Sequence, residues 1–175
     1  MIILSCDIGK QGALVVGRYT EEGLNILHIL SMPESNKEKM EKIKGWHEKY
    51  KIDIFLIEQQ LGRSGNSAQA NFTIGRNVGV LQCISDLLDL SILSVYPQTW
   101  QTILKSITPL PIFNNQKLDV SKKKSLSLAL SSFPSLTLAT KTRSSVKYLD
   151  GIADAVCMQL WYISKYSSTS LPFIT

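Results

Sequence analysis

Cysteine, histidine and long hydrophobic runs are all scarce in this sequence of 175 residues. An odd number of cysteines, widely spaced at Cys6, Cys83 and Cys157, excludes a disulfide framework and is typical of buried free thiols in a reducing compartment. No apolar run reaches the ~18 to 20 residues that a membrane-spanning helix needs, and the first residues resemble a strand rather than a charged leader. We therefore expect a soluble, unprocessed cytosolic protein that has no membrane partner.

Glycine and proline are also few, with 10 and 6 residues, while 44% of the chain is hydrophobic and 19% is charged. This composition excludes collagen, repeat and disordered architectures. Nothing in it marks a linker. We expect one globular domain that spans residues 1–175.

Acidic residues are nearly absent between positions 101 and 149. Asp119 is the only acid in that segment, which carries eight of the 19 Lys and Arg residues of the chain, whereas the whole chain has a net charge of +5. A local excess of basic charge is typical of a surface that binds phosphates, although a solvated lysine-rich face explains it too.

The hydrophobic pattern predicts alternating strands and helices. Strands are expected over 2–6, 12–19, 24–32, 53–57 and 92–95, and helices over 37–51, 67–90, 98–104, 119–130 and 150–166, with a loop over 108–115 and a flexible polar segment over 140–145. The first three strands form a meander, and the helix between the last two strands makes them parallel. The prediction is an α/β fold with a mixed β-sheet and helices on both faces.

Four acids lie where buried elements begin or end: Asp7, Glu58, Asp150 and Asp154. Carboxylates at the ends of apolar strands are costly to desolvate, and like charges four residues apart on a helix repel, so a bound divalent cation is the natural compensation. Mg²⁺ and Mn²⁺ prefer such oxygen ligands. Taken singly, Asp7 also fits an Asp-x-Gly turn and Asp150 fits a helix N-cap.

Several blocks, in order, resemble the RuvC-type Holliday junction resolvases of the RNase H-like nuclease superfamily, most closely the phage and plastid-type branch. They are Cys6-Asp7-Ile-Gly9, Leu56-Ile-Glu58-Gln-Gln60, Ser64 to Ser67 with Phe72 to Gly79, Tyr96-Pro-Gln-Thr-Trp100, and Asp150-Gly-Ile-Ala-Asp154. Bacterial RuvC usually separates its last two acids by three residues, whereas the spacing of four here is similar to the plastid branch.

The resemblance implies an RNase H-like fold, a homodimer, and paired nicks that resolve a four-way DNA junction. It also implies that Asp7, Glu58, Asp150 and Asp154 are catalytic and together hold two Mg²⁺ ions, with Mn²⁺ as a substitute. A cytoplasmic location in a bacterial or phage-infected host cell follows. His28 and His47 are expected to have only surface or packing roles.

DNA contacts are expected from the loop after Glu58 and from the basic segment. The residues predicted to bind DNA are Arg63, Ser64, Lys122, Lys123, Lys141, Arg143 and Lys147. Trp100 fits either a base-stacking role or, more simply, the core. Gly75 and Gly79 form a face of small residues that fits either packing on the protein's own sheet or a twofold helix–helix interface.

Two other functions are consistent with parts of the sequence. The Asp7-x-Gly9 turn is similar to the first phosphate loop of actin-like and sugar-kinase-like ATPases, but no second such loop follows. A non-catalytic junction-binding protein with the same fold is the other alternative, and the presence of all four acids argues against it.

Overall fold

The computed structural model describes residues 1–9, 11–60, 67–114, 116–141 and 146–166. Its elements are β1 (Ile2–Asp7), β2 (Ala13–Thr20), β3 (Gly23–Ser31), α1 (Asn36–Tyr50), β4 (Ile54–Glu58), α2 (Ala68–Leu87), β5 (Ile92–Val95), α3 (Pro97–Trp100), the 3₁₀ turns η1 (Gln101–Leu104) and η2 (Pro111–Phe113), α4 (Val120–Ser132), β6 (Ala139–Lys141), β7 (Val146–Tyr148) and α5 (Asp150–Tyr166). No helix in the described ranges is long and apolar enough to cross a membrane.

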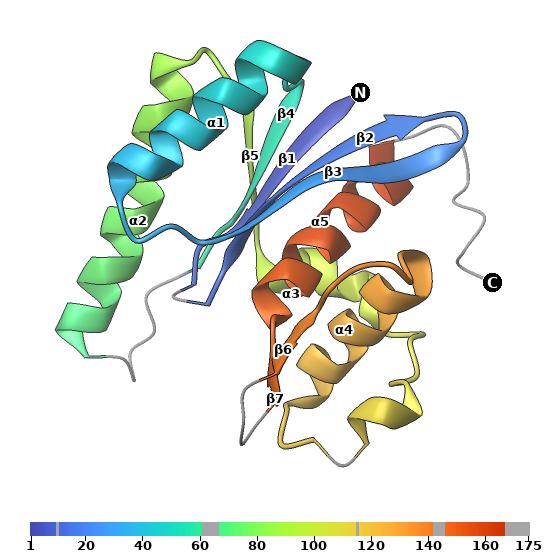
Figure 1. Cartoon of the computed structure of the whole chain (residues 1–175). Helices are drawn as coiled ribbons and strands as arrows, with labels where there is room; N and C mark the ends of the chain where they lie inside the picture. Colours follow the sequence, from blue (N-terminus) through green and yellow to red (C-terminus); the bar gives the residue numbers. More distant parts are fainter. Residues whose placement is uncertain (10, 61–66, 115, 142–145, 167–175) are drawn as a thin grey trace.

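A five-stranded sheet in the order β3-β2-β1-β4-β5 forms the centre of the fold (Figure 1). The β1–β2 and β2–β3 pairs are antiparallel, while β1–β4 and β4–β5 are parallel. Helices α1 and α2 cover one face, and α4 and α5 cover the other. The predicted mixed sheet, with a meander and helices on both faces, is confirmed.

Strand alternation decides which side chains face α5. Ile2, Leu4 and Cys6 of β1 belong to the core under α1 and α2, whereas Ile3 belongs to the core under α4 and α5. With a period of two, Asp7 points to the α5 side. On β4, Leu56 faces that same side, so Glu58 does too.

Buried polar side chains fix α5 against the sheet. The Gln159 amide donates hydrogen bonds to Ser5 Oγ and to the Val15 carbonyl, both at 2.9 Å. Ser5 Oγ donates to the Ala155 carbonyl at 2.8 Å. Gly17 makes this approach possible, because a Cβ there would lie 2.2 Å from Gln159 Oε1. These bonds hold one helix face in a single register on β1 and β2.

Three sequence-based expectations need correction. Residues 140 and 141, expected in a flexible segment over 140–145, belong instead to a short strand over 139–141 that pairs antiparallel with a strand over 146–148. Residues 142–145 lie outside the described ranges. Pro111 begins a 3₁₀ turn inside the predicted loop, because proline is well suited to the first position of a helix. Cys83 is exposed rather than buried, since it lies on the outer face of α2, whereas Cys6 and Cys157 are buried as expected.

Candidate active site

The four predicted acids come from three elements that converge at one end of the sheet. Asp7 ends β1, Glu58 ends β4, and α5 begins at Asp150 with Asp154 one turn later. The parallel pairing of β1 and β4 continues to Cys6 and Ile57, so the acids after these residues follow at the same level. The packing of α5 on β1 brings its first turn to this position.

Gly151 lets the start of α5 lie directly against Asp7. A Cβ at Gly151 would lie 2.3 Å from the Gln11 carbonyl oxygen and 2.9 Å from Asp7 Oδ2. Any larger residue would force the helix away from the strand end. A glycine directly after Asp150 is therefore required by the close packing of α5 against β1.

Asp7 has both of the roles that its sequence context allows. Its Oδ1 accepts a hydrogen bond from the Gly9 backbone N–H at 3.0 Å, which is the turn expected of Asp-x-Gly. Its pKa is raised to about 6, first by burial and then by the charge of Glu58, while the Gly9 bond opposes the rise. The turn thus fixes the position of the Asp7 carboxylate, whose charged form is disfavoured when no cation is nearby.

Asp154 is the most strongly perturbed of the four. Its pKa is raised to about 8, first by burial and then by the charges of Asp7, Glu58 and Asp150, while a hydrogen bond from Ser125 opposes the rise. A group that feels the other three acids belongs to one electrostatic cluster with them. We call Asp7, Glu58, Asp150 and Asp154 the acidic cluster.

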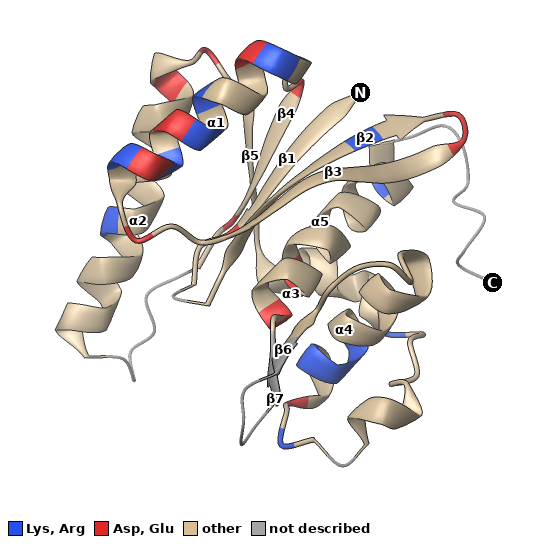
Figure 2. Ribbon diagram, viewed as in Figure 1, with Lys and Arg blue, Asp and Glu red and all other residues tan. Residues whose placement is uncertain are grey.

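Asp150 is bound by a basic residue rather than left facing the other acids. The Lys122 ammonium, from the first turn of α4, forms an ion pair with Asp150 Oδ2. This contact, together with the charge of Asp154, raises the pKa of Lys122. Figure 2 shows basic residues of α4 beside the acids at the start of α5. A cation is therefore already favoured at the edge of the acidic cluster.

Glu58 is held on both of its oxygens. The Trp100 indole N–H donates to Oε1 at 2.9 Å, and the Gln60 amide donates to Oε2 at 3.3 Å. Trp100 is 1% exposed, so it is a core residue, and the base-stacking alternative is wrong. Its contact with Glu58 joins residues 42 positions apart, and no sequence pattern marks it.

The acidic cluster is suited to divalent metal ions by the chemistry of its donors. All of its donors are carboxylate oxygens, and burial and neighbouring acids raise the pKa of two of them, Asp7 and Asp154. Among the described residues, no three acidic, histidine or cysteine side chains form a ready-made metal site. A divalent cation bound among these carboxylates would relieve the repulsion between them. The metal-ligand assignment stays a prediction.

The residues predicted to contact DNA lie in several environments. Lys123 Nζ donates to the Asn114 carbonyl at 3.1 Å, and Lys124 Nζ donates to the Leu104 carbonyl at 3.0 Å. Lys122, Lys123 and Lys124 thus each have a partner within the protein, and the DNA contacts predicted for Lys122 and Lys123 stay a prediction. Lys141 and Lys147 belong to the β6–β7 hairpin, and Arg63, Ser64 and Arg143 lie outside the described residues.

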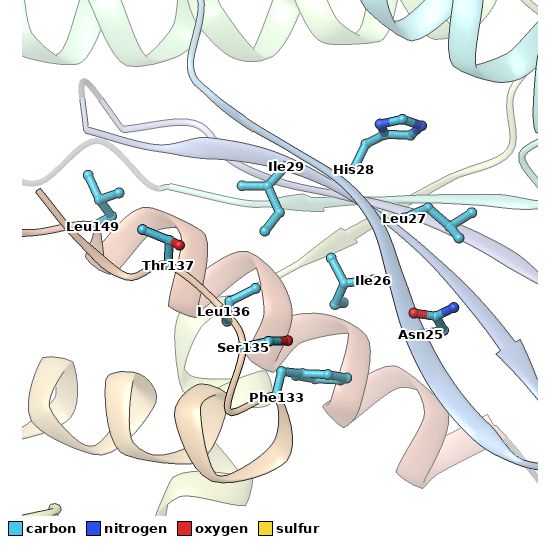
Figure 3. A pocket seen from close by; sticks show the side chains of 10 residues that line it. All are labelled: Asn25, Ile26, Leu27, His28, Ile29, Phe133, Ser135, Leu136, Thr137 and Leu149. Atoms are coloured by element: carbon cyan, nitrogen blue, oxygen red, sulfur yellow. The ribbon is translucent and has the colours of Figure 1, made fainter.

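A groove of about 460 Å³ lies apart from the acidic cluster (Figure 3). It is lined by residues 25–29 of β3, residues 133 and 135–137 after α4, and Leu149. His28 is the one titratable residue in this lining; it stacks on Trp46, and burial lowers its pKa. None of the four acids lines the groove, and the packing role expected for His28 is confirmed.

The architecture is that of known junction resolvases. RuvC from Thermus thermophilus, in complex with a Holliday junction substrate, superposes with a TM-score of 0.56 at 13% identity over 98% of this chain and 99% of that one. Fowlpox virus resolvase, with its junction DNA, gives 0.54 at 17% identity over 93% and 99%. The yeast mitochondrial Holliday junction resolvase Ydc2 gives 0.51 at 15% over 94% and 80%.

The fold is therefore the RNase H-like fold of the RuvC-type resolvases, as the sequence blocks suggested. No protein-family model matches the sequence, and no curated protein matches it.

Proposed function

We propose that this chain is a structure-selective DNA endonuclease, acting in recombination or repair, that resolves four-way junctions by paired nicks. The observation that carries the proposal is the acidic cluster: four carboxylates from β1, β4 and α5 meet at one end of an RNase H-like sheet. The known proteins with this fold named above are junction resolvases. We propose that residues 1–175 act as one nuclease domain in the cytoplasm of a bacterial or phage-infected cell.

Asp7, Glu58, Asp150 and Asp154 are the residues that we propose as ligands of two Mg²⁺ ions, with Mn²⁺ as a substitute. When bound, such ions supply an activated water and charge stabilisation for in-line attack at phosphorus. The chain itself contributes the orientation of the carboxylates: the Gly9 N–H holds Asp7, and Ser125 holds Asp154. Lys122 then lies where it can neutralise a DNA phosphate once Asp150 binds metal.

The proposal is tested on a synthetic four-way junction. We expect symmetric, ligatable nicks that require Mg²⁺ or Mn²⁺, and much less cleavage of linear duplex of the same sequence. ATP turnover should be absent in the same preparation. Metal-independent cleavage, equal cleavage of duplex, or ATP turnover without cleavage contradicts the proposal.

We propose that the basic surface binding DNA includes Lys122 and Lys123, with Lys141, Arg143 and Lys147 and, near the metals, Arg63 and Ser64. The first turn of α4 places Lys122 against Asp150, and Lys122 and Lys123 both lie partly exposed. The positive charge of Lys122 at the edge of the acidic cluster favours the approach of a phosphate.

Neutralising Lys122 and Lys123 together to Gln is expected to weaken binding to junction and duplex alike. Two lost phosphate contacts release fewer counterions, so the slope of log affinity against log salt should fall by about 2. Binding is measured by fluorescence anisotropy at several salt concentrations. The control is Lys42→Gln with Lys44→Gln on α1, which changes the net charge by the same amount and should leave the slope unchanged. An unchanged slope in the Lys122/Lys123 variant would mean that these lysines serve solubility and do not contact phosphates.

We also propose a homodimer, because two nicks on opposed strands of a junction with approximate twofold symmetry need two active sites. Gly75 and Gly79 support a helix–helix interface. Both are exposed on α2, and a Cβ at either position meets no other described residue within 4 Å. Packing on the protein's own sheet is therefore wrong for these glycines, whose face also carries Phe72 at 65% exposure.

Gly79→Glu is expected to convert the dimer to a monomer without unfolding it. The new side chain has free space in the protomer but places charge in a close helix–helix contact. Light scattering after gel filtration measures the mass. Gly45→Glu on α1 is the matched control, since that glycine is also helical, exposed and open, and it should stay dimeric. Equal masses for both variants place the interface elsewhere.

A further inference from the structure

A buried tryptophan, Trp100, contacts the acidic cluster from the hydrophobic core. Trp100 Nε1 lies 2.9 Å from Glu58 Oε1, and the two residues are 1% and 7% exposed. Glu58 pairs with Val95 in the β4–β5 register, and the chain turns back after β5 through α3. Pro97 occupies the first position of this single turn, and the backbone N–H of Thr99 donates to the Tyr96 carbonyl at 2.9 Å. The turn thus carries Trp100 back under the end of β4.

In the contact between Trp100 and Glu58, the indole can only donate and the carboxylate accepts. An indole N–H donates and cannot accept, so it is satisfied here only by an acceptor such as the carboxylate. The Trp100 ring packs in the core with Leu56 and Val95, which prevents it from following a moving carboxylate. Glu58 Oε2 has a different partner, the Gln60 amide at 3.3 Å, on a partly exposed side chain just beyond the strand. One oxygen is therefore fixed from the core, and the other faces a replaceable partner.

We propose that Trp100 is a positioning residue that engages Oε1 of Glu58 and so leaves Oε2 as the single oxygen that Glu58 offers to a metal ion. The proposal rests on the proposed function only in taking Glu58 as a metal ligand. Partners that orient ligand side chains commonly change metal affinity or activity about 10- to 100-fold when they are removed. A purely structural role for Trp100 predicts lower stability with unchanged metal affinity.

Trp161 provides the matched control. It is 5% exposed and belongs to the same core, but its Nε1 has no hydrogen-bond partner among the described residues. Trp100→Phe and Trp161→Phe both replace an indole with a smaller ring, and both lose core volume. Only Trp100→Phe removes a donor from Glu58.

The experiment measures Mn²⁺ binding to DNA-free protein by electron paramagnetic resonance, and the Mn²⁺ concentration that gives half-maximal junction cleavage in single turnover. Trp100→Phe is expected to weaken both about tenfold, with a smaller loss of the rate at saturating metal. Trp161→Phe should show wild-type values for both, whatever its thermal midpoint. Equal metal affinity in the two variants overturns the positioning role.

A second measurement covers the case in which Trp100→Phe does not fold. With Trp46 and Trp161 replaced by Phe, Trp100 is the one tryptophan left of the three in the chain, and its emission should change when Mg²⁺ binds. Adding Glu58→Gln should remove that response. Mg²⁺ binding seen by calorimetry without any change in Trp100 emission contradicts the proposal. Failure of the wild type to cleave junctions refutes the proposed nuclease function instead, so the two failures are distinguishable.

Discussion

Replacing Asp7 with Asn, or Glu58 with Gln, is expected to abolish cleavage of a four-way junction while binding to the junction is kept. Each change removes a charged metal ligand and leaves the basic surface of α4 intact. The cleavage rate should fall far below about a tenth of the wild-type rate at saturating Mg²⁺, since a neutral amide oxygen is a poor ligand for a hard cation. Single-turnover cleavage and anisotropy with Ca²⁺ in place of Mg²⁺ measure the two properties.

Binding should tighten slightly in these variants when no metal is present, because a carboxylate that faces a phosphate repels it. Glu22→Gln in the turn between β2 and β3 is the control, since it removes an exposed carboxylate at the opposite end of β2 from Ala13, the residue that pairs with Asp7. It should cleave like the wild type. A variant of Asp7 or Glu58 that retains about a tenth of the activity contradicts the assignment of that residue.

The strand ends and their acids could be predicted from sequence because both follow from short-range patterns. An apolar run of strand length that stops at Glu58, and another that stops at Asp7, place each carboxylate within a residue. Parallel pairing then brings two strand ends to one edge. The side of the sheet on which they lie also follows, since alternation along the strand has a period of two.

The partners of those acids could not be predicted. The Trp100–Glu58 bond and the Lys122–Asp150 ion pair join residues 42 and 28 positions apart, and both depend on how α3 and α4 pack after folding. The sequence showed a basic helix start at Lys122, for which a phosphate was one explanation. Proximity to Asp150 supplies another, because α4 and α5 lie side by side on the same face of the sheet.

Weak local signals explain the remaining differences. Strands β6 and β7 have three residues each, too few for a pattern of alternation to be recognised. Helix α2 carries apolar residues on more than one side, so Cys83 was expected to be buried although it is exposed.

The acidic cluster is also a source of instability in the metal-free protein, and Asp154 shows this most clearly. A free aspartate has a pKa of 3.8, whereas burial and its acidic neighbours raise the pKa of Asp154 to about 8 in the folded chain. Between these two values the folded protein holds a proton that the unfolded chain has released. The free energy of unfolding therefore falls as the pH rises through this range, and the full penalty is present above pH 8.

Asp154→Asn is accordingly expected to be nearly inactive and yet more stable than the wild type without metal. At pH 9 the gain should be at least about 2 kcal/mol, which raises the thermal midpoint by about 5 °C in a domain of this size. The difference in stability between variant and wild type should shrink toward pH 4, where the Asp154 carboxyl of the folded wild type is protonated and therefore uncharged, as Asn is. Mg²⁺ should raise the midpoint of the wild type more than that of the variant, because binding to the folded state alone stabilises it.

Asp154→Glu separates a metal ligand from a merely structural carboxylate. The longer side chain keeps the charge and can still reach an oxygen-ligated cation, so we expect partial cleavage activity and no alkaline gain in stability. If Asp154 only offsets the charge of Lys122, which it already stabilises through space, both variants should cleave equally and both should melt at lower temperature. Single-turnover cleavage with thermal melting at pH 5 and pH 9 decides between the two cases. Asp154 is identified as a residue kept for its chemistry at a cost in stability if Asp154→Asn is more stable but does not cleave, while Asp154→Glu cleaves in part and gains no stability.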